Sequence, residues 1–136
     1  MKIYFEHERL QVYQSSLEFI RWSEPMLERL AKTAAVYSQL DRARTSIPLN
    51  IAEGNAKFTP ADKCKYFDTA HGSAVEGAAR LDVLALKQVL NPAELDEGKT
   101  KLSSLVGLLI GLIRSKLPDR FREDSPEYRV HAETVE

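Results

Sequence analysis

The sequence predicts an all-α protein, an antiparallel up-and-down four-helix bundle that assembles into an oligomer. Four segments carry apolar residues at alternating spacings of three and four, which places those residues on one face of a helix. Two of the segments begin with a capping residue and a proline, Thr59-Pro60 and Asn91-Pro92, a combination typical of helix N-termini. The last segment is apolar nearly all round, which predicts burial against a second subunit.

The composition is that of one globular domain. Of the 136 residues, 43% are apolar and 29% are charged, and we predict a bundle domain over residues 1–117 and a polar, flexible tail over 118–136. The longest uncharged apolar run, 105–113, is far shorter than the roughly 20 residues that span a bilayer. A single cysteine, Cys64, and an N-terminus without a secretory signal pattern predict a cytoplasmic protein with no membrane contact.

Charge by itself does not indicate a nucleic-acid partner. The net charge is −1. Residues 1–117 hold 16 Lys and Arg against 14 Asp and Glu, and residues 118–136 hold 3 against 6. The predicted bundle is therefore mildly basic and the tail acidic, well short of the strong basic excess typical of nucleic-acid-binding domains.

The first helix is expected to begin near Glu8 and to end near Trp22. Its apolar seam is predicted at spacings of three, four and three, on Leu10, Tyr13, Leu17 and Ile20. Ser23-Glu24-Pro25 is interpreted as a break, followed by a further turn over residues 26–30.

The second helix is predicted from near Thr33 to Gly54 or a residue or two beyond, with a kink or loosened turn at Pro48. Its apolar seam is Leu40, Ala43, Ile47 and Ile51. A polar stripe runs directly beside that seam, on Gln39, Arg42, Ser46, Asn50 and Glu53. Polar groups at the edge of a core need partners, so we predict a structural network of these residues with Ser73 and Glu76 of the next helix.

The third helix is predicted over residues 60–89, with small residues in its first half that allow the second helix to pack closely. Glu76 is the expected partner of Arg42 or Asn50. A metal enzyme using Glu53, His71 and Glu76 is an alternative, but the paired Glu-x-x-His motifs of di-iron bundles are absent from the sequence. We therefore predict no catalytic residue, no metal site and no cofactor, and interpret Cys64 as a small buried hydrophobe.

The fourth helix is predicted over residues 92–116. Its core face is Leu102, Leu105, Leu109 and Leu112. The opposite face is also apolar, and we predict an oligomer interface there on Gly107, Leu108, Ile110 and Gly111. The alternative is that Gly107 and Gly111 simply fit the core of the monomer, since glycines four apart are best known from tight crossings of membrane helices.

Short motifs in the second and third segments carry a family resemblance. They are Gln39-Leu40-Asp41-Arg42-Ala43, Ser46-Ile47, Asn50-Ile51-Ala52-Glu53-Gly54, and Ala70-His71-Gly72-Ser73 with Glu76. Over residues 10–116 the chain resembles the bacterial four-helix bundle family of ribosomal RNA intervening-sequence proteins, relatives of the accessory variability proteins of diversity-generating retroelements. The resemblance implies a homopentamer without enzymatic activity and, in the retroelement branch, a basic surface that engages RNA and a reverse transcriptase.

The function predicted from these observations is a non-enzymatic oligomeric scaffold that binds RNA or an RNA-handling protein. The candidate RNA contacts lie near the turn between the second and third helices, at Lys57, Phe58, Lys63 and Lys65. An ordinary solvated loop is the competing interpretation of these residues. A protein-interaction or structural ring with no nucleic-acid role is the competing function, which the near-neutral charge favours.

Overall fold

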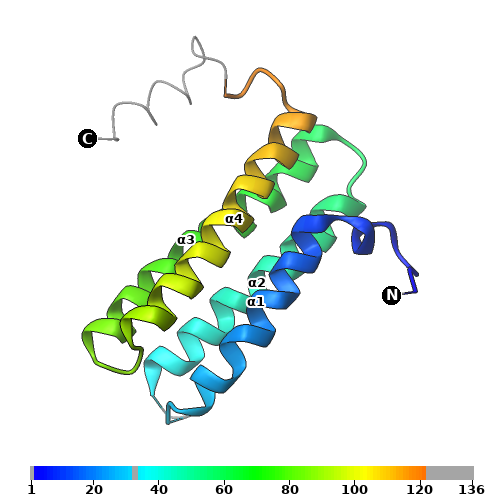
Figure 1. Ribbon diagram of the computed structural model, residues 1–136. Helices are drawn as coiled ribbons and strands as arrows, with labels where there is room; N and C mark the ends of the chain where they lie inside the picture. Colours follow the sequence, from blue (N-terminus) through cyan, green and yellow to red (C-terminus); the bar gives the residue numbers. More distant parts are fainter. Residues whose placement is uncertain (1, 32–33, 122–136) are drawn as a thin grey trace.

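The structure is a computed structural model that describes residues 2–31 and 34–121. A short 3-10 helix, η1 (Glu6–Arg9), precedes four α-helices: α1 (Gln11–Glu28), α2 (Ala35–Ala56), α3 (Pro60–Leu86) and α4 (Pro92–Lys116) (Figure 1). Within the described ranges there is no strand. The prediction of an all-α chain with four helices is confirmed. Residues 122–136 of the predicted tail, and the predicted start of the second helix at Thr33, lie outside the described residues.

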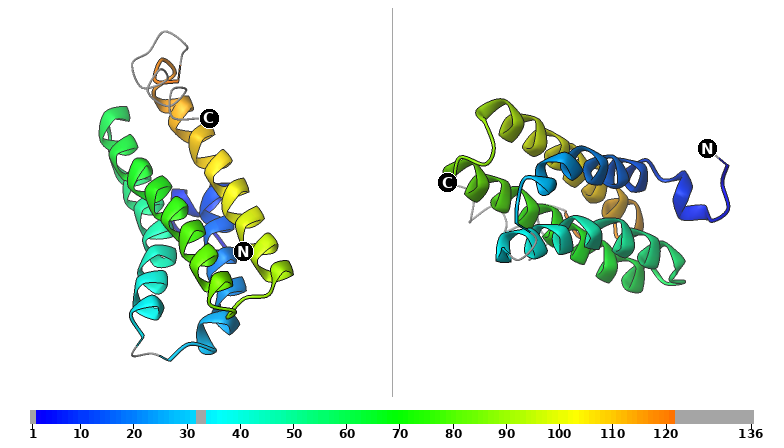
Figure 2. Two further views of the ribbon diagram at one scale, coloured as in Figure 1. Left: turned by 90° about the vertical axis from the view of Figure 1, so that its left-hand side faces the viewer. Right: turned by 90° about the horizontal axis from the view of Figure 1, so that it is seen from below.

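Each helix packs against two others, as Figure 2 shows from two directions. The packed pairs are α1 with α2, α2 with α3, α3 with α4, and α1 with α4. Asp82 near the end of α3 pairs with Lys99 near the start of α4 at 2.9 Å, whereas Asp68 near the start of α3 pairs with Arg120 just beyond α4. α3 and α4 therefore run in opposite directions.

The two predicted caps start α3 and α4 as expected. The hydroxyl of Thr59 accepts a hydrogen bond from the backbone N–H of Asp62 at 3.1 Å. The side chain of Asn91 accepts one from the backbone of Glu94 at 2.8 Å, and Glu94 accepts one in return from the backbone of Asn91 at 3.0 Å. Each bond satisfies an N–H that the first helical turn leaves without an intrahelical partner.

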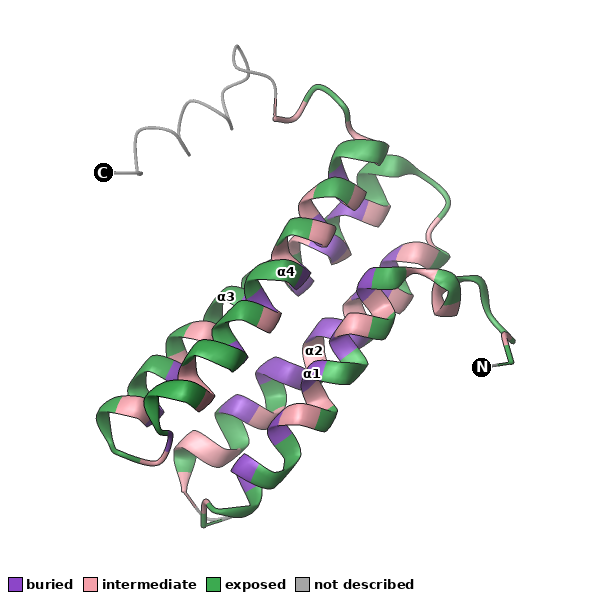
Figure 3. Cartoon of the chain, viewed as in Figure 1, coloured by how far each residue is buried: buried purple, intermediate pink, exposed green. Residues whose placement is uncertain are grey.

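Buried and exposed residues alternate along each helix, as the colours of Figure 3 show, and the buried apolar residues form one main core cluster. The predicted α2 seam is fully buried or nearly so, as are Leu102, Leu105 and Leu109 of α4. Leu112, predicted in the core, is only half-buried, and Ile113 is buried in its place at 2% exposure. The end of α2 at Ala56 is within the predicted range, whereas α3 ends at Leu86, before the predicted end at residue 89.

The predicted seam of the first helix is only partly correct, since Leu10 and Tyr13 are partly buried against the core but Leu17 is not. Leu17 is 40% exposed, and the buried positions are instead Val12, Ser16, Phe19, Ser23, Met26 and Leu27. The two serines occupy the seam because their hydroxyls donate to backbone carbonyls of the preceding turn, Ser16 to Tyr13 at 2.6 Å and Ser23 to Ile20 at 3.1 Å. A buried hydroxyl with such a partner carries little penalty.

The predicted break at Ser23-Glu24-Pro25 is also wrong, because α1 continues through Pro25 to Glu28. Proline removes one helical hydrogen bond, the one that its N–H would donate to the carbonyl of Arg21. Arg21 is exposed, so water can satisfy that carbonyl. The neighbouring carbonyl of Ile20 accepts hydrogen bonds from the side chains of Ser23 and Arg44. α2 likewise continues through the buried Pro48.

Two glycines mark the closest approaches between helices. A Cβ atom at Gly54 of α2 would lie 2.9 Å from the backbone oxygen of Lys63 in α3. One at Gly98 of α4 would lie 2.6 Å from the Trp22 ring of α1 and 2.7 Å from Leu81 of α3. Only a residue without a side chain fits at these positions without movement of its neighbours.

The first residues of the predicted tail pack against the bundle. Arg120 donates two hydrogen bonds to the carboxylate of Asp68 in α3, at 2.8 and 2.6 Å. Phe121 packs beside a small cluster of Cys64, Phe67 and Ile113. The chain just beyond α4 is thus tied back to the start of α3. No helix in the part of the chain that the structure describes is long and apolar enough to cross a membrane.

Candidate functional site

The predicted polar stripe of α2 lies where α2 meets α3. The amide of Asn50 donates to the carbonyl and the hydroxyl of Ser46, at 2.8 and 2.9 Å. The hydroxyl of Ser73 on α3 meets that of Ser46 at 2.9 Å. These three residues form one hydrogen-bonded group across the two helices, and the small serine side chains let the helices approach closely.

A second group forms around Arg80, which the sequence interpretation missed. Its guanidinium donates to Gln39 of α2 at 2.8 Å and to Glu76, one turn earlier on α3, at 2.5 Å. The expectation that Glu76 pairs with Arg42 or Asn50 is wrong, because Arg80 lies one turn from Glu76 on the same helix face and holds its carboxylate. The Nε atom of Arg80 is buried and has no hydrogen-bond partner among the described residues.

Arg42 and Glu53 do not join either group. Both are exposed, and neither side chain makes a hydrogen bond or ion pair within residues 2–31 and 34–121. Arg42 borders a small cavity of about 100 Å³ between α2 and α3, which Gln39, Ser46, Ser73 and Arg80 also line. No three His, Cys, Asp or Glu side chains in the described ranges gather as metal ligands would.

The most buried charge of the bundle is Arg44, another residue that the sequence interpretation missed. Only 5% of Arg44 is exposed. Its guanidinium contacts Asp41 at 2.8 Å and Glu24 of α1 at 2.7 Å, and it donates to the hydroxyl of Ser23 at 3.0 Å. Arg44 lies at helical spacing between Leu40 and Ile47, so its place in the apolar seam was the available signal. These contacts fasten α1 to α2.

The candidate RNA contacts lie together at one end of the bundle. Lys57 and Phe58 form the turn between α2 and α3, and Phe58 is 98% exposed. The ammonium of Lys57 lies 5.1 Å from the ring centroid of Tyr66, and that of Lys63 donates to the carbonyl of Asn55 at 2.7 Å. Lys65 is largely exposed on α3 and pairs with Asp62, one turn earlier on the same helix, at 3.8 Å.

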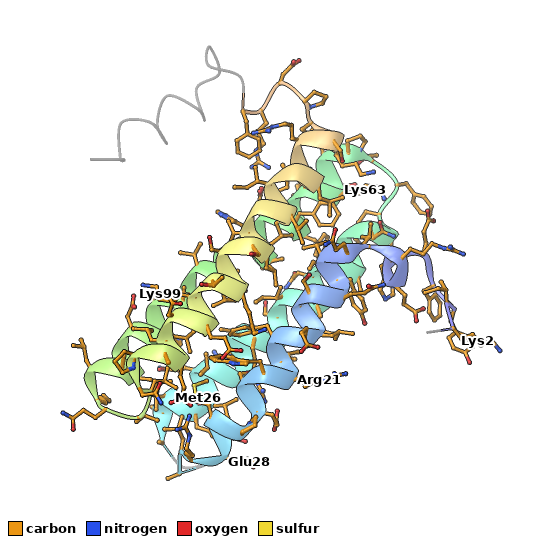
Figure 4. The ribbon with its side chains drawn as sticks, viewed as in Figure 1. Lys2, Arg21, Met26, Glu28, Lys63 and Lys99 are labelled. Atoms are coloured by element: carbon orange, nitrogen blue, oxygen red, sulfur yellow. The ribbon has the colours of Figure 1, made fainter. Side chains whose placement is uncertain are left out.

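The N-terminal segment reaches the same turn. Phe5, Glu6 and His7 line a groove of about 450 Å³ together with Lys57, Phe58 and Lys63, and we call this the N-terminal groove. Figure 4 shows Lys63 beside the α2–α3 turn and Lys2 on the segment that leaves the same end of the bundle, far from Lys99. Nothing in the helical periodicity indicated this contact, because the first residues fall outside every predicted helix.

The outer face of α4 is open. A Cβ atom at Gly107 or Gly111 would meet nothing within 4 Å, and both glycines are exposed. The alternative that they fit the core of the monomer is therefore wrong. Leu108 and Ile110 are half-buried on the flanks of these glycines. Within the described residues, no other segment covers the two glycines.

Comparison with known proteins identifies the family. A model of the 23S rRNA-intervening sequence proteins matches residues 8–111. The chain belongs to the 23S rRNA-intervening sequence protein family. The family resemblance drawn from the motifs of α2 and α3 is confirmed, and those motifs correspond to the Ser46 and Arg80 groups at the α2–α3 contact.

A solved structure shares the fold of this intervening-sequence protein. It is a crystal structure of a protein with unknown function from the S23 ribosomal protein family of Bacteroides thetaiotaomicron. The two chains are 25% identical, with a TM-score of 0.69, and the match covers 76% of this chain and 98% of the other. A search of curated proteins found no match.

Proposed function

We propose that this chain is a non-enzymatic, cytoplasmic scaffold, an antiparallel up-and-down bundle over residues 1–117 with a polar tail, that assembles as a homo-oligomer and binds RNA. The observation that carries the proposal is membership of a family named for an intervening sequence of 23S rRNA. The N-terminal groove adds support, because it combines two lysines with exposed aromatic rings. Cations bind phosphates and aromatic rings stack on bases.

The oligomer is proposed from the outer face of α4. The exposed Gly107 and Gly111 leave room for a second backbone to approach, and Leu108 and Ile110 supply apolar surface on either side. A pentamer is the assembly that the family resemblance implies. An assembly would bring several N-terminal grooves together, so that weak contacts to one RNA would add through effective concentration.

A titration with a structured RNA transcript at about 50 and 200 mM salt tests RNA binding, because phosphate contacts lose affinity steeply over this range. We expect micromolar or tighter binding at the lower salt and a marked loss at the higher. Absence of binding at about 50 mM salt would contradict the proposal.

A pair of charge-reversal variants makes the test specific to the groove end. Lys57→Glu with Lys65→Glu changes the charge near the groove and spares Lys63, whose ammonium holds the carbonyl of Asn55. Lys87→Glu with Lys101→Glu makes the same change in net charge just after α3 and on α4. We expect the first pair to weaken RNA binding by at least tenfold and the second to have little effect. An equal loss of RNA affinity in the two double variants would indicate non-specific electrostatic attraction.

A protein-interaction ring without RNA is the second candidate. It is favoured by an exposed apolar row on α3, where Val75, Val83 and Leu86 are 51%, 44% and 85% exposed. An oligomer that binds no RNA in the titration would make this function the better account.

A further inference from the structure

The two phenylalanines of the N-terminal groove are both exposed. Phe5 is 68% exposed and Phe58 is 98% exposed, and they come from segments about fifty residues apart in the chain. Single exposed hydrophobic residues need no explanation. Two large aromatic side chains that line one groove beside two lysines form a surface with a specific chemistry.

Phe5 is held in place before any ligand arrives. The carboxylate of Glu8 accepts hydrogen bonds from the backbone N–H groups of Tyr4, at 3.1 Å, and Phe5. The ring of Phe5 stacks on His7 at a centroid distance of 6.0 Å and an interplanar angle of 14°. His7 in turn packs edge-on against Tyr13 of α1 at 4.7 Å. One face of the Phe5 ring is thus packed against His7, which is itself held by Tyr13.

Phe58 is presented by a short, fixed turn. Lys57 caps the end of α2 through its backbone N–H, which donates to the carbonyl of Gly54 at 3.1 Å. Thr59 caps the start of α3. The backbone on both sides of Phe58 is therefore restrained, and little conformational entropy is lost from it when the ring gains a partner.

The charges of the groove are arranged unevenly. Lys57 and Lys63 lie on the side of the α2–α3 turn, and Glu6 lies on the side of the N-terminal segment. The ammonium of Lys63 gives one of its three N–H groups to Asn55, which leaves two for a ligand. A phosphate is favoured beside the lysines and disfavoured beside Glu6, whereas the neutral face of a base is compatible with Phe5.

The geometry points to the N-terminal groove as a site for unpaired RNA, with bases stacking on Phe5 and Phe58 and the adjoining phosphates bound by Lys57 and Lys63. This inference rests on the proposed RNA-binding function and specifies its substrate class. A-form duplex RNA keeps its base faces stacked inside the helix, so rings in a groove can reach only bases in single strands, loops or bulges. The expected ligand is therefore single-stranded rather than paired.

The test uses a 12-nucleotide oligouridylate with one central 2-aminopurine, whose fluorescence falls when the base stacks. A fully paired RNA duplex of the same length is the comparison. We expect the full-length protein to bind the single strand, to quench the fluorophore, and to bind the duplex at least tenfold more weakly. Equal affinity for strand and duplex would overturn the inference.

Substitution of the two rings separates stacking from charge. Phe5→Leu with Phe58→Leu keeps apolar bulk but removes the aromatic faces, and Leu86→Ala, at an 85% exposed apolar position outside the groove, is the control. Stacking of one base on each ring predicts an affinity loss of about five- to 150-fold per ring, so at least about 25-fold for the double variant. The control should lose no affinity, and the dependence on salt should not change.

The outcomes distinguish this inference from the function on which it rests. If neither the strand nor the structured transcript binds, the proposed function fails and the inference fails with it. If RNA binds and the Phe5→Leu/Phe58→Leu variant binds it as the unaltered protein does, RNA binding stands and the stacking site is overturned. Circular dichroism of the variant confirms that any loss of affinity occurs in a folded protein.

Discussion

The guanidinium of Arg44 donates a hydrogen bond to the hydroxyl of Ser23 at 3.0 Å, across the contact between α2 and α1. Both residues are buried, and the hydroxyl of Ser23 in turn donates a hydrogen bond to the carbonyl of Ile20. A positive charge in an apolar seam is tolerated here because acidic side chains at the rim, Glu24 and Asp41, balance it.

Arg44→Met tests this contact, since methionine fills much of the same space without donors. The carbonyl and hydroxyl acceptors on α1 lose a partner, and we expect the free energy of unfolding to fall by about 1–3 kcal/mol in urea titrations. Glu24→Gln is the matched control. Because Glu24 is half-exposed, with a side-chain exposure of 50%, its loss should cost less than about 1 kcal/mol. A variant Arg44→Met as stable as the unaltered chain would show that the buried charge contributes no net stability.

Gly98→Ala should destabilise the bundle. The added methyl would lie 2.6 Å from the ring of Trp22 and 2.7 Å from Leu81, and overpacking of this kind costs about 1–3 kcal/mol. That cost exceeds the gain of about 1 kcal/mol for replacing a helical glycine by alanine. At Gly72, where a methyl meets nothing within 4 Å, the same change should stabilise. In urea titrations, the free energy of unfolding should fall for Gly98→Ala and rise for Gly72→Ala. A stabilising Gly98→Ala would refute the tight α1–α4 contact.

Ile110→Glu should break the proposed oligomer, because it places a charge on the outer face of α4 where a second subunit is expected to pack. Light scattering would report the fall in mass. Leu49→Glu provides the control, since Leu49 is 63% exposed on α2, and α2 does not pack against α4. A mass equal to one chain for the unaltered protein would exclude the interface altogether.

Glu94 should contribute stability only above acidic pH. The hydrogen bond from Arg29 and the backbone N–H of Asn91 hold the pKa of Glu94 below its ordinary value of 4.5. A lowered folded-state pKa means that the stabilisation is complete above about pH 4.5 and is lost as the pH falls through the folded-state pKa. Glu94→Gln should therefore lower the free energy of unfolding by up to about 1 kcal/mol at neutral pH. At a pH low enough to protonate the carboxylate in both the folded and the unfolded state, the two proteins should be equally stable. Urea titrations of both proteins across this range measure the difference, and a gap that persists in acid would contradict the assignment.

Sequence patterns predicted the parts of the fold that depend on local chemistry. The caps at Thr59 and Asn91 fixed the starts of α3 and α4, and the seam from Leu40 to Ile51 placed the buried face of α2. α1 was misinterpreted because Ser16 and Ser23 occupy its core positions. A pattern of apolar residues cannot recognise a serine that is buried through a backbone hydrogen bond.

Of the N-terminal groove, only the residues at the α2–α3 turn could be predicted from the sequence. Lys57, Phe58 and Lys63 were indicated by their place in a turn between two helices, whereas Phe5 and His7 belong to a segment with no helical period. Their approach to the turn depends on the packing of α1 against α2, which no single segment encodes. The pairing of Glu76 was missed for the opposite reason: Arg80 lies four residues later on the same helix, and this local spacing was a signal available in the sequence.

Helix packing in this bundle also constrains the order of folding. Three of the four packed helix pairs join consecutive helices, and only the α1–α4 contact joins the two ends of the domain. Contacts between consecutive helices form quickly because only a short loop must be closed, at little cost in entropy. Packing of α1 on α4 closes the longest segment of chain and therefore costs the most conformational entropy. Trp22, the single tryptophan, lies in that closing contact against Gly98. Its fluorescence during refolding should therefore report the final step, after most of the helical signal has already formed.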